Sequence, residues 1–383
     1  MKSRARTCIL VAGMHRSGTS AMTRVVNLLG ADIAGDLVDG IPGDNDRGFW
    51  ESHATYRLHD RLFAAFDSAW HDPYPLPDGW QEADAAREAK RAIRDHIDRE
   101  FAISRMFVVK DPRMTRVLPL WLEALDELAI APVIVIPFRN PLEVAASLER
   151  RDGLTPARSL LAYIQCNLEV ERASRGRRRM FQPYDDLISD WRSFAEKLAC
   201  SGGPDAKALS PAIAGDIDSF LSADLKRHQA TRASLASVPT GAAMLAEIYD
   251  RMVQAAATGN ETSLRAYFDR VREGFGEMAK LFGTVASAQA KDHRDEITRL
   301  KAKAGAEIAR RAAETNELRA QVNALEARAE DAARAQAAAD QEISSMQRST
   351  SWRVTAPLRA IGRLVKAAGA RRATLKHSDV RSS

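Results

Sequence analysis

Residues 7–20 read Thr7-Cys-Ile-Leu-Val-Ala-Gly13-Met-His-Arg16-Ser-Gly18-Thr19-Ser20 and carry the strongest structural signal in this 383-residue chain. They begin with an apolar run typical of a buried strand and continue into a loop bounded by two glycines. Behind the loop, apolar residues recur at helical spacing up to an expected stop at Gly30, namely Met22, Val25, Val26 and Leu29. The stretch therefore predicts a strand, a loop and a helix.

The spacing of the two glycines is typical of an anion-binding loop. Glycines at 13 and 18 let successive backbone N–H groups and the N-terminus of the helix point at one anion. The spacing is that of the nucleotide-binding P-loop, except that Thr19 stands where that motif has a lysine for the β- and γ-phosphates. Without the lysine, a triphosphate with magnesium loses its main point charge, whereas a sulfonated phosphate can still be held. A loop that merely joins a strand to a helix is the alternative interpretation.

Polar side chains follow three further apolar runs, at the point where each run ends. Lys110-Asp111-Pro112-Arg113 follows residues 106–109, Arg139-Asn140-Pro141 follows 133–138, and Tyr184-Asp185-Asp186-Leu187 follows 180–183. Strands that alternate with helical segments indicate an α/β fold with a parallel sheet, and ligands bind such sheets outside the carboxyl ends of the strands. Any one cluster could be a surface pair or a loop cap. Four clusters at one edge predict a functional site.

On these motifs, from about Thr7 to Leu187, the chain resembles the sulfotransferases that use 3′-phosphoadenosine 5′-phosphosulfate (PAPS). The resemblance is to bacterial members and, more distantly, to the tyrosylprotein enzymes. It implies a P-loop-type parallel sheet flanked by helices and PAPS as the donor. It also implies donor contacts from the loop, from an Arg-x7-Ser pattern for the 3′-phosphate and from a Tyr-x-Asp-Leu tyrosine. The predicted donor-binding residues are Gly13, Arg16, Ser17, Gly18, Thr19, Ser20, Arg139, Ser147, Arg151 and Tyr184.

The arginines near the 3′-phosphate pattern also agree with helical geometry. Ser147 and Arg151 are four residues apart, so they share one helix face, and Arg139 lies in the loop that leads into that helix. Together they could surround one dianionic phosphate. For Arg151 an alternative stays open, because residues 149–152 also have the composition of a solvated helix end.

Three residues are expected to act in the chemistry. Sulfuryl transfer needs positive groups where charge develops, which Arg16 and Lys110 can supply, and a base for the acceptor hydroxyl. Glu51 is the expected base, because the aromatic residues before it could desolvate its carboxylate. Asp111 and His53 are rival bases, and a surface role for Glu51 is the alternative. His15 could contact substrate or hydrogen-bond a loop carbonyl.

Composition excludes several other functions. The eight histidines and three cysteines show no Cys-x2-Cys or His-x3-His spacing, so no zinc site is expected. The few scattered cysteines favour a reducing, cytoplasmic location, and the first apolar run is better explained as a strand than as a signal peptide. From Arg348 onward there are nine lysines and arginines against one aspartate, so the tail carries the net charge of +5 and the main domain is not expected to bind nucleic acid.

We expect three parts: a sulfotransferase domain over residues 1–285, a long helix or coiled coil over 286–347, and a basic amphipathic tail over 348–383. The middle part lacks proline and repeats apolar residues at three and four, which suits pairing with a second copy or with a partner. In the tail, Leu358, Ile361, Leu364 and Val365 share one face and the basic residues lie elsewhere. Such a tail could contact the inner membrane surface, dock on a partner or stay solvated.

The predicted function is transfer of a sulfuryl group from PAPS to a hydroxyl, with a cell-surface carbohydrate as the expected acceptor. A small-molecule kinase is the competing enzyme class, and the absent P-loop lysine argues against it. A degenerate nucleotide-binding domain that serves as a coiled-coil scaffold is the non-enzymatic alternative.

Overall fold

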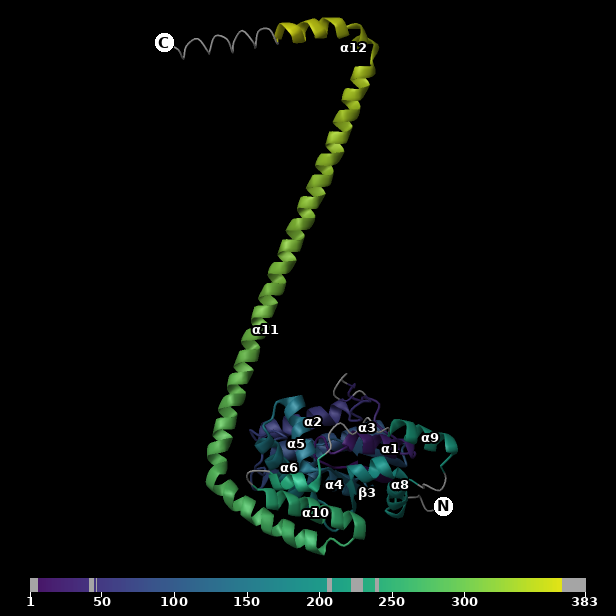
Figure 1. The fold of residues 1–383 in the computed structure, drawn as a ribbon, viewed down its shortest axis with the longest axis vertical. Coiled ribbons are helices and arrows are strands. Elements are labelled where there is room, and N and C mark those ends of the chain that lie inside the picture. Colours follow the sequence, from purple (N-terminus) through teal and green to yellow (C-terminus); the bar gives the residue numbers. More distant parts are fainter. Residues whose placement is uncertain are drawn as a thin grey trace. The chain divides into compact units, whose positions relative to one another are not determined.

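The computed structural model describes residues 6–40, 45, 47–204, 209–221, 230–237 and 241–366. The chain divides into two compact units, Met1–Asp292 and His293–Ser383 (Figure 1). This division does not test the predicted domain boundaries at 285 and 347, which stay predictions. Among the described residues, no helix combines the length and the apolar character needed to cross a bilayer.

A four-stranded parallel sheet forms the centre of the first unit. Its strands are β1 (Thr7–Val11), β2 (Met106–Lys110), β3 (Ala131–Phe138) and β4 (Arg178–Pro183), in the order β2-β1-β3-β4. In register, Val11 pairs with Lys110 on one side and with Val135 on the other. All four strands point the same way, so their carboxyl ends and the polar clusters that follow lie at one edge. The predicted α/β fold with a parallel sheet is confirmed.

Helices cover both faces of the sheet, because neighbouring strand residues point to opposite sides. Cys8 and Leu10 pack into one core, whereas Ile9 and Val11 pack into the other. The second core includes residues of α1 (Thr19–Leu28), α7 (Tyr184–Ser189), α8 (Trp191–Cys200) and α9 (Pro211–Phe220). The larger first core includes residues of α2 (His53–Ala65), α3 (Asp84–Phe101), α4 (Met114–Glu127), α5 (Pro141–Asp152), α6 (Pro156–Ala173) and α10 (Ala242–Thr258).

Side-chain caps and prolines fix where several helices begin. Ser52 accepts a hydrogen bond from the Ala54 N–H at the start of α2, and Asn140 accepts one from the Leu142 N–H at the start of α5. Pro141 occupies the first turn of α5, where its missing N–H costs nothing. The described residues of this unit also include the short 3-10 helices η1 (Trp80–Glu82) and η4 (Arg232–Ser237).

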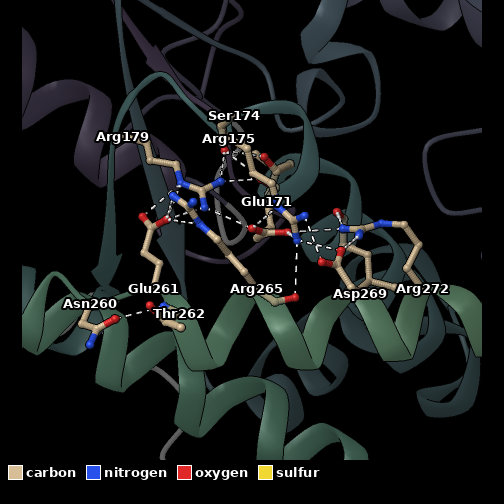
Figure 2. Close-up of polar contacts among 12 residues, drawn as sticks. Glu171, Ser174, Arg175, Arg179, Asn260, Glu261, Thr262, Arg265, Asp269 and Arg272 are labelled. Carbon is tan, nitrogen blue, oxygen red and sulfur yellow. Dashed lines mark hydrogen bonds and ion pairs between the residues drawn. The ribbon is translucent and has the colours of Figure 1, made fainter.

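A cluster of charged side chains joins α6, β4 and the first turns of α11 (Thr262–Arg348), as Figure 2 shows. Its centre is the fully buried carboxylate of Glu171, which pairs with Arg175 at 2.8 Å, Arg179 at 3.0 Å and Arg272 at 3.3 Å. A buried carboxylate is tolerated only where cations and hydrogen bonds compensate its lost hydration. Glu261 adds a second carboxylate beside Arg179. The cluster explains why the beginning of α11 belongs to the Met1–Asp292 unit.

The predicted long C-terminal helix is confirmed, since α11 runs for 87 residues. Its apolar residues at three-and-four spacing are exposed, among them Ile308 at 68% and Leu318 at 55%. Pairing of this helix with a second copy or a partner stays a prediction. After it come α12 (Thr350–Val354) and a helical stretch over 356–366, whereas residues 367–383 of the predicted basic tail lie outside the described residues.

Candidate active site

A cleft of about 710 Å³ lies at the carboxyl edge of the sheet. Its walls come from the loop after β1, the segment before α2, the loop after β2, the loop after β3 with α5, and the residue after β4. Among the described residues that line it, seven are lysine or arginine and two are acidic. Such an excess of positive charge in a concave site suits a ligand that carries several negative charges.

Both glycines of the β1 loop are required by close contacts. A Cβ on Gly13 would lie 2.5 Å from the carbonyl oxygen of Pro137, so only glycine lets the loop pass this close to β3. Gly18 has φ of +84°, and a Cβ there would lie 2.1 Å from the ring of Tyr184. Both positions therefore need glycine because the loop passes very close to a neighbouring residue, Pro137 of β3 at Gly13 and Tyr184 after β4 at Gly18.

We predict that Gly18→Ala abolishes binding of an adenosine bisphosphate and lowers the melting temperature more than Gly176→Ala does. Gly176 has a similar φ of +75°, but no atom lies near the position that a Cβ would take. The control variant Gly176→Ala therefore loses only the free energy that a left-handed backbone costs an alanine, about 1–2 kcal/mol. Adding Tyr184→Ala to Gly18→Ala removes the clash and is expected to recover part of the lost stability. Calorimetry of the variants checks this, and equal losses for Gly18→Ala and Gly176→Ala would contradict it.

The loop arginine meets the helix that follows β3. Arg16 adopts a left-handed conformation with φ of 66°, and its Nε donates a hydrogen bond to the Oγ of Ser147 at 2.7 Å. Arg139, 8% exposed, forms an ion pair with Glu143 and lies 4.9 Å from the ring centroid of Tyr184. The structure thus brings the β1 loop and the predicted phosphate pair into one cleft.

The other predicted donor-binding residues differ in whether they line the cleft. Thr19 and Ser20 line the cleft, and Tyr184 both lines it and packs over Gly18. The hydroxyl of Ser17 is fully buried without a hydrogen-bond partner among the described residues, and Ser17 is not part of the cleft wall, so its contact with the donor stays a prediction. Gly13 is also outside the wall, because it lies against β3.

Arg151 also lines the cleft. Its guanidinium is 2.7 Å from Asp152 and 5.9 Å from the ring centroid of Trp70. The structure therefore places it beside an aromatic side chain that the sequence did not link to the donor. Its contact with a 3′-phosphate stays a prediction.

Lys110 and Glu51 form a buried ion pair in the cleft. The Nζ of Lys110 lies 3.0 Å from Glu51 Oε2 and also donates to the carbonyl oxygen of Phe49 at 2.7 Å. The two charged residues are 3% and 6% exposed, so neither is a surface charge. The Oγ of Ser20, at 3.3 Å from Nζ, connects the pair to the β1 loop. A carboxylate and an ammonium group thus meet beside the predicted anion site.

The rival bases are placed less favourably. Asp111 is fully buried and does not line the cleft. One of its oxygens lies 2.9 Å from Nδ1 of His59, and the other accepts hydrogen bonds from Arg113. Burial alone would raise the pKa of Asp111, but the Arg113 guanidinium and His59 hold that pKa well below its ordinary range. Asp111 as the base stays an untested alternative, although His59 and Arg113 engage its carboxylate. His53 is exposed and lines the cleft.

His15 is a buried residue of the cleft wall. Its ring lies tilted against Trp70 with centroids 3.9 Å apart, and its Nε2 is buried with no hydrogen-bond partner among the described residues. Burial, followed by the charges of Arg151 and Arg113, holds the pKa of His15 well below its ordinary value. The expected carbonyl hydrogen bond is absent at this nitrogen.

Several residues that line the cleft were not predicted from the sequence. Arg47 and Phe220 are 173 positions apart, yet Arg47 donates to the Phe220 carbonyl and lies 5.7 Å from its ring centroid. Arg113 lies 4.2 Å from the ring centroid of Tyr56. No local pattern links Arg47 to Phe220, whereas Arg113 stood next to Lys110 in a motif already singled out. Among the described residues, no cluster of three or more His, Cys, Asp or Glu side chains could hold a metal ion.

Comparison with solved structures gives weak matches, including two to sulfotransferase domains. No protein-family model matches the chain, and no curated protein matches it by sequence. The sulfotransferase domain of the Synechococcus PCC 7002 olefin synthase aligns with a TM-score of 0.36 at 17% identity, covering 65% of this chain and 97% of that domain. The sulfotransferase domain from the curacin biosynthetic pathway aligns at 0.31 and 16%, covering 55% and 77%. Both are sulfotransferase domains. Likeness at this level assigns no activity, which has to come from the site itself.

Proposed function

We propose that the chain is a sulfotransferase that transfers a sulfuryl group from PAPS to a hydroxyl of a carbohydrate. One observation carries the proposal: a P-loop without its lysine shares a cleft with Arg139 and Ser147, and the buried Lys110–Glu51 pair lies beside it. This arrangement offers one place for an activated sulfate and another for a second phosphate.

The cleft fits the PAPS donor better than it fits a nucleoside triphosphate. Thr19 cannot supply the ammonium group that P-loop nucleotidases use for the β- and γ-phosphates. The loop amides, Arg16 and Ser20 would hold the phosphosulfate, and Arg139 with Ser147 would hold the ribose phosphate. Because the glycines at 13 and 18 are required by close contacts, a bulkier loop could not form the same cradle.

The Lys110–Glu51 pair supplies the chemistry that the transfer needs. A bond forms between the acceptor oxygen and sulfur, the bond from sulfur to the 5′-phosphate oxygen breaks, and the acceptor loses its proton. In the proposal Glu51 accepts that proton, while Lys110 and Arg16 offset negative charge on the oxygens around sulfur. The partial exclusion of water around the pair strengthens both effects.

A carbohydrate acceptor is supported by two aromatic side chains in the cleft wall. Trp70 and Tyr56 both line the cleft, with arginine side chains close to each ring. Flat aromatic faces beside hydrogen-bond donors suit a polar ring with several hydroxyls.

The cysteines at 8, 166 and 200 are free thiols, which supports a reducing, cytoplasmic location.

The proposal is tested by incubating the full chain with PAPS and a panel of oligosaccharides. We expect release of adenosine 3′,5′-bisphosphate that depends on the acceptor, with a sulfuryl group added to the acceptor by mass spectrometry. Phosphate transfer from ATP to the same panel would instead support a kinase. Binding of the bisphosphate with no transfer to any acceptor would support a nucleotide-binding scaffold.

A further inference from the structure

The described part of the tail carries a row of exposed apolar side chains. We call this row the apolar tail face: Trp352, Val354, Leu358, Ile361, Leu364 and Val365. Each is between 41% and 71% exposed, although side chains of this kind are normally removed from water. At 100° per residue, Leu358, Ile361 and Val365 lie on one side of the 356–366 helix and Arg359, Arg363 and Lys366 on the opposite side. The helix is amphipathic with a purely basic polar face.

The charge around this face has one sign. No Asp or Glu occurs between Glu342 and Asp379, whereas nine lysines and arginines lie from Arg348 onward. Arg359 lies 3.8 Å from the ring centroid of Trp352, so a basic residue also accompanies the aromatic residue of the row. Two such tails placed side by side would repel each other, which argues against a second copy as the occupant.

We propose that residues 350–366 dock on a membrane surface that exposes anionic lipid headgroups. Apolar side chains enter the boundary between headgroups and acyl chains, and the basic residues contact the headgroups. Arg359, Arg363 and Lys366 recur along the whole described stretch of this helix, so it is expected to lie along the surface rather than to cross the bilayer. This inference goes beyond the proposed function, because it concerns where the chain acts and requires no turnover.

The test is co-sedimentation of the full chain with vesicles of phosphatidylcholine, with and without 30% phosphatidylglycerol. Wild type is expected to sediment only with the anionic vesicles. Leu358→Gln with Ile361→Gln shortens the apolar face at constant charge and is expected to weaken binding at least tenfold. Arg363→Gln with Lys366→Gln is expected to weaken it about 25-fold at low salt, roughly fivefold for each cation. Glutamine keeps helix propensity close to that of the residues it replaces.

A matched control changes exposed apolar residues outside the tail. Ile308→Gln with Leu318→Gln is expected to bind vesicles as wild type does, since these positions are similarly exposed but lie on α11. Equal binding to neutral and anionic vesicles would overturn the proposal, as would equal loss in the control. The proposal would also be overturned if the variant with Leu358→Gln and Ile361→Gln bound anionic vesicles as tightly as wild type does. Binding would then depend on charge alone, and the tail would bind any polyanion, nucleic acid included.

Discussion

Glu51→Gln is expected to lower turnover by roughly 10²–10⁴-fold while leaving the affinity for adenosine 3′,5′-bisphosphate almost unchanged. The amide has nearly the same shape and can still accept a hydrogen bond from Lys110 Nζ, which now lies 3.0 Å from the carboxylate. Lys110 also keeps its bond to the Phe49 carbonyl. The cleft should therefore retain its form and lose only the proton acceptor. Initial rates at saturating PAPS, with bisphosphate binding by calorimetry, separate the two effects.

Asp152→Asn provides the matched control, because Asp152 is the other acidic residue among those described in the cleft wall. It removes the same charge but pairs with Arg151 rather than with Lys110. Its turnover should stay within a few-fold of wild type. Near-normal turnover in Glu51→Gln would contradict Glu51 as the base and would leave His53 and Asp111 as the candidates.

Arg139→Ala is expected to weaken binding of adenosine 3′,5′-bisphosphate by about 2–3 kcal/mol, roughly 30- to 150-fold. Adenosine 5′-monophosphate should bind the variant and wild type alike, because it lacks the 3′-phosphate that Arg139 is proposed to hold. The comparison of the two ligands by calorimetry isolates the 3′-phosphate contact. Arg177→Ala, which removes an exposed arginine paired with Asp126, controls for the change in net charge.

Stability has to be separated from binding in this variant. Glu143 is 2% exposed and pairs with Arg139, so the substitution leaves a buried carboxylate without its cation. Combining Arg139→Ala with Glu143→Gln removes that charge while the glutamine can still accept from the Ala230 N–H. Equal weakening of both ligands in the double variant would mean that Arg139 only supports the fold. Unchanged binding of the bisphosphate would remove Arg139 from the site.

The sheet and the loop could be predicted because local patterns determine them. Strands β1, β2 and β3 are short apolar runs that end at a glycine, at a lysine or at an Arg-Asn-Pro segment, and the parallel arrangement brings these segments to one edge. Gly13 and Gly18 were recognisable from their P-loop spacing, and the structure shows that no other residue fits beside Pro137 and Tyr184. The long helix was recognisable because it lacks proline, whereas pairing of that helix depends on a partner the sequence does not contain.

The individual roles of charged residues could not be predicted in the same way. The sequence favoured Glu51 over Asp111 as the base only from its aromatic neighbours, whereas the fold shows that Lys110 meets Glu51 while Arg113 and His59 engage Asp111. The left-handed turn at Arg16 is followed by Ser17 with its hydroxyl buried outside the cleft wall, which a pattern of small residues does not reveal. Contacts between residues far apart in the sequence, such as Arg47 with Phe220, also form part of the cleft wall, and no local sequence pattern predicts them.

Titration of the full chain with adenosine 3′,5′-bisphosphate in the presence of EDTA is the most direct test of the proposed donor site. We expect one bisphosphate to bind per chain without magnesium and to be displaced by PAPS, because arginine side chains and loop amides hold the anion. ATP with magnesium should compete far more weakly, since Thr19 replaces the P-loop lysine. Absence of bisphosphate binding, or tighter binding of magnesium ATP, would contradict the assignment of this cleft to a sulfuryl donor.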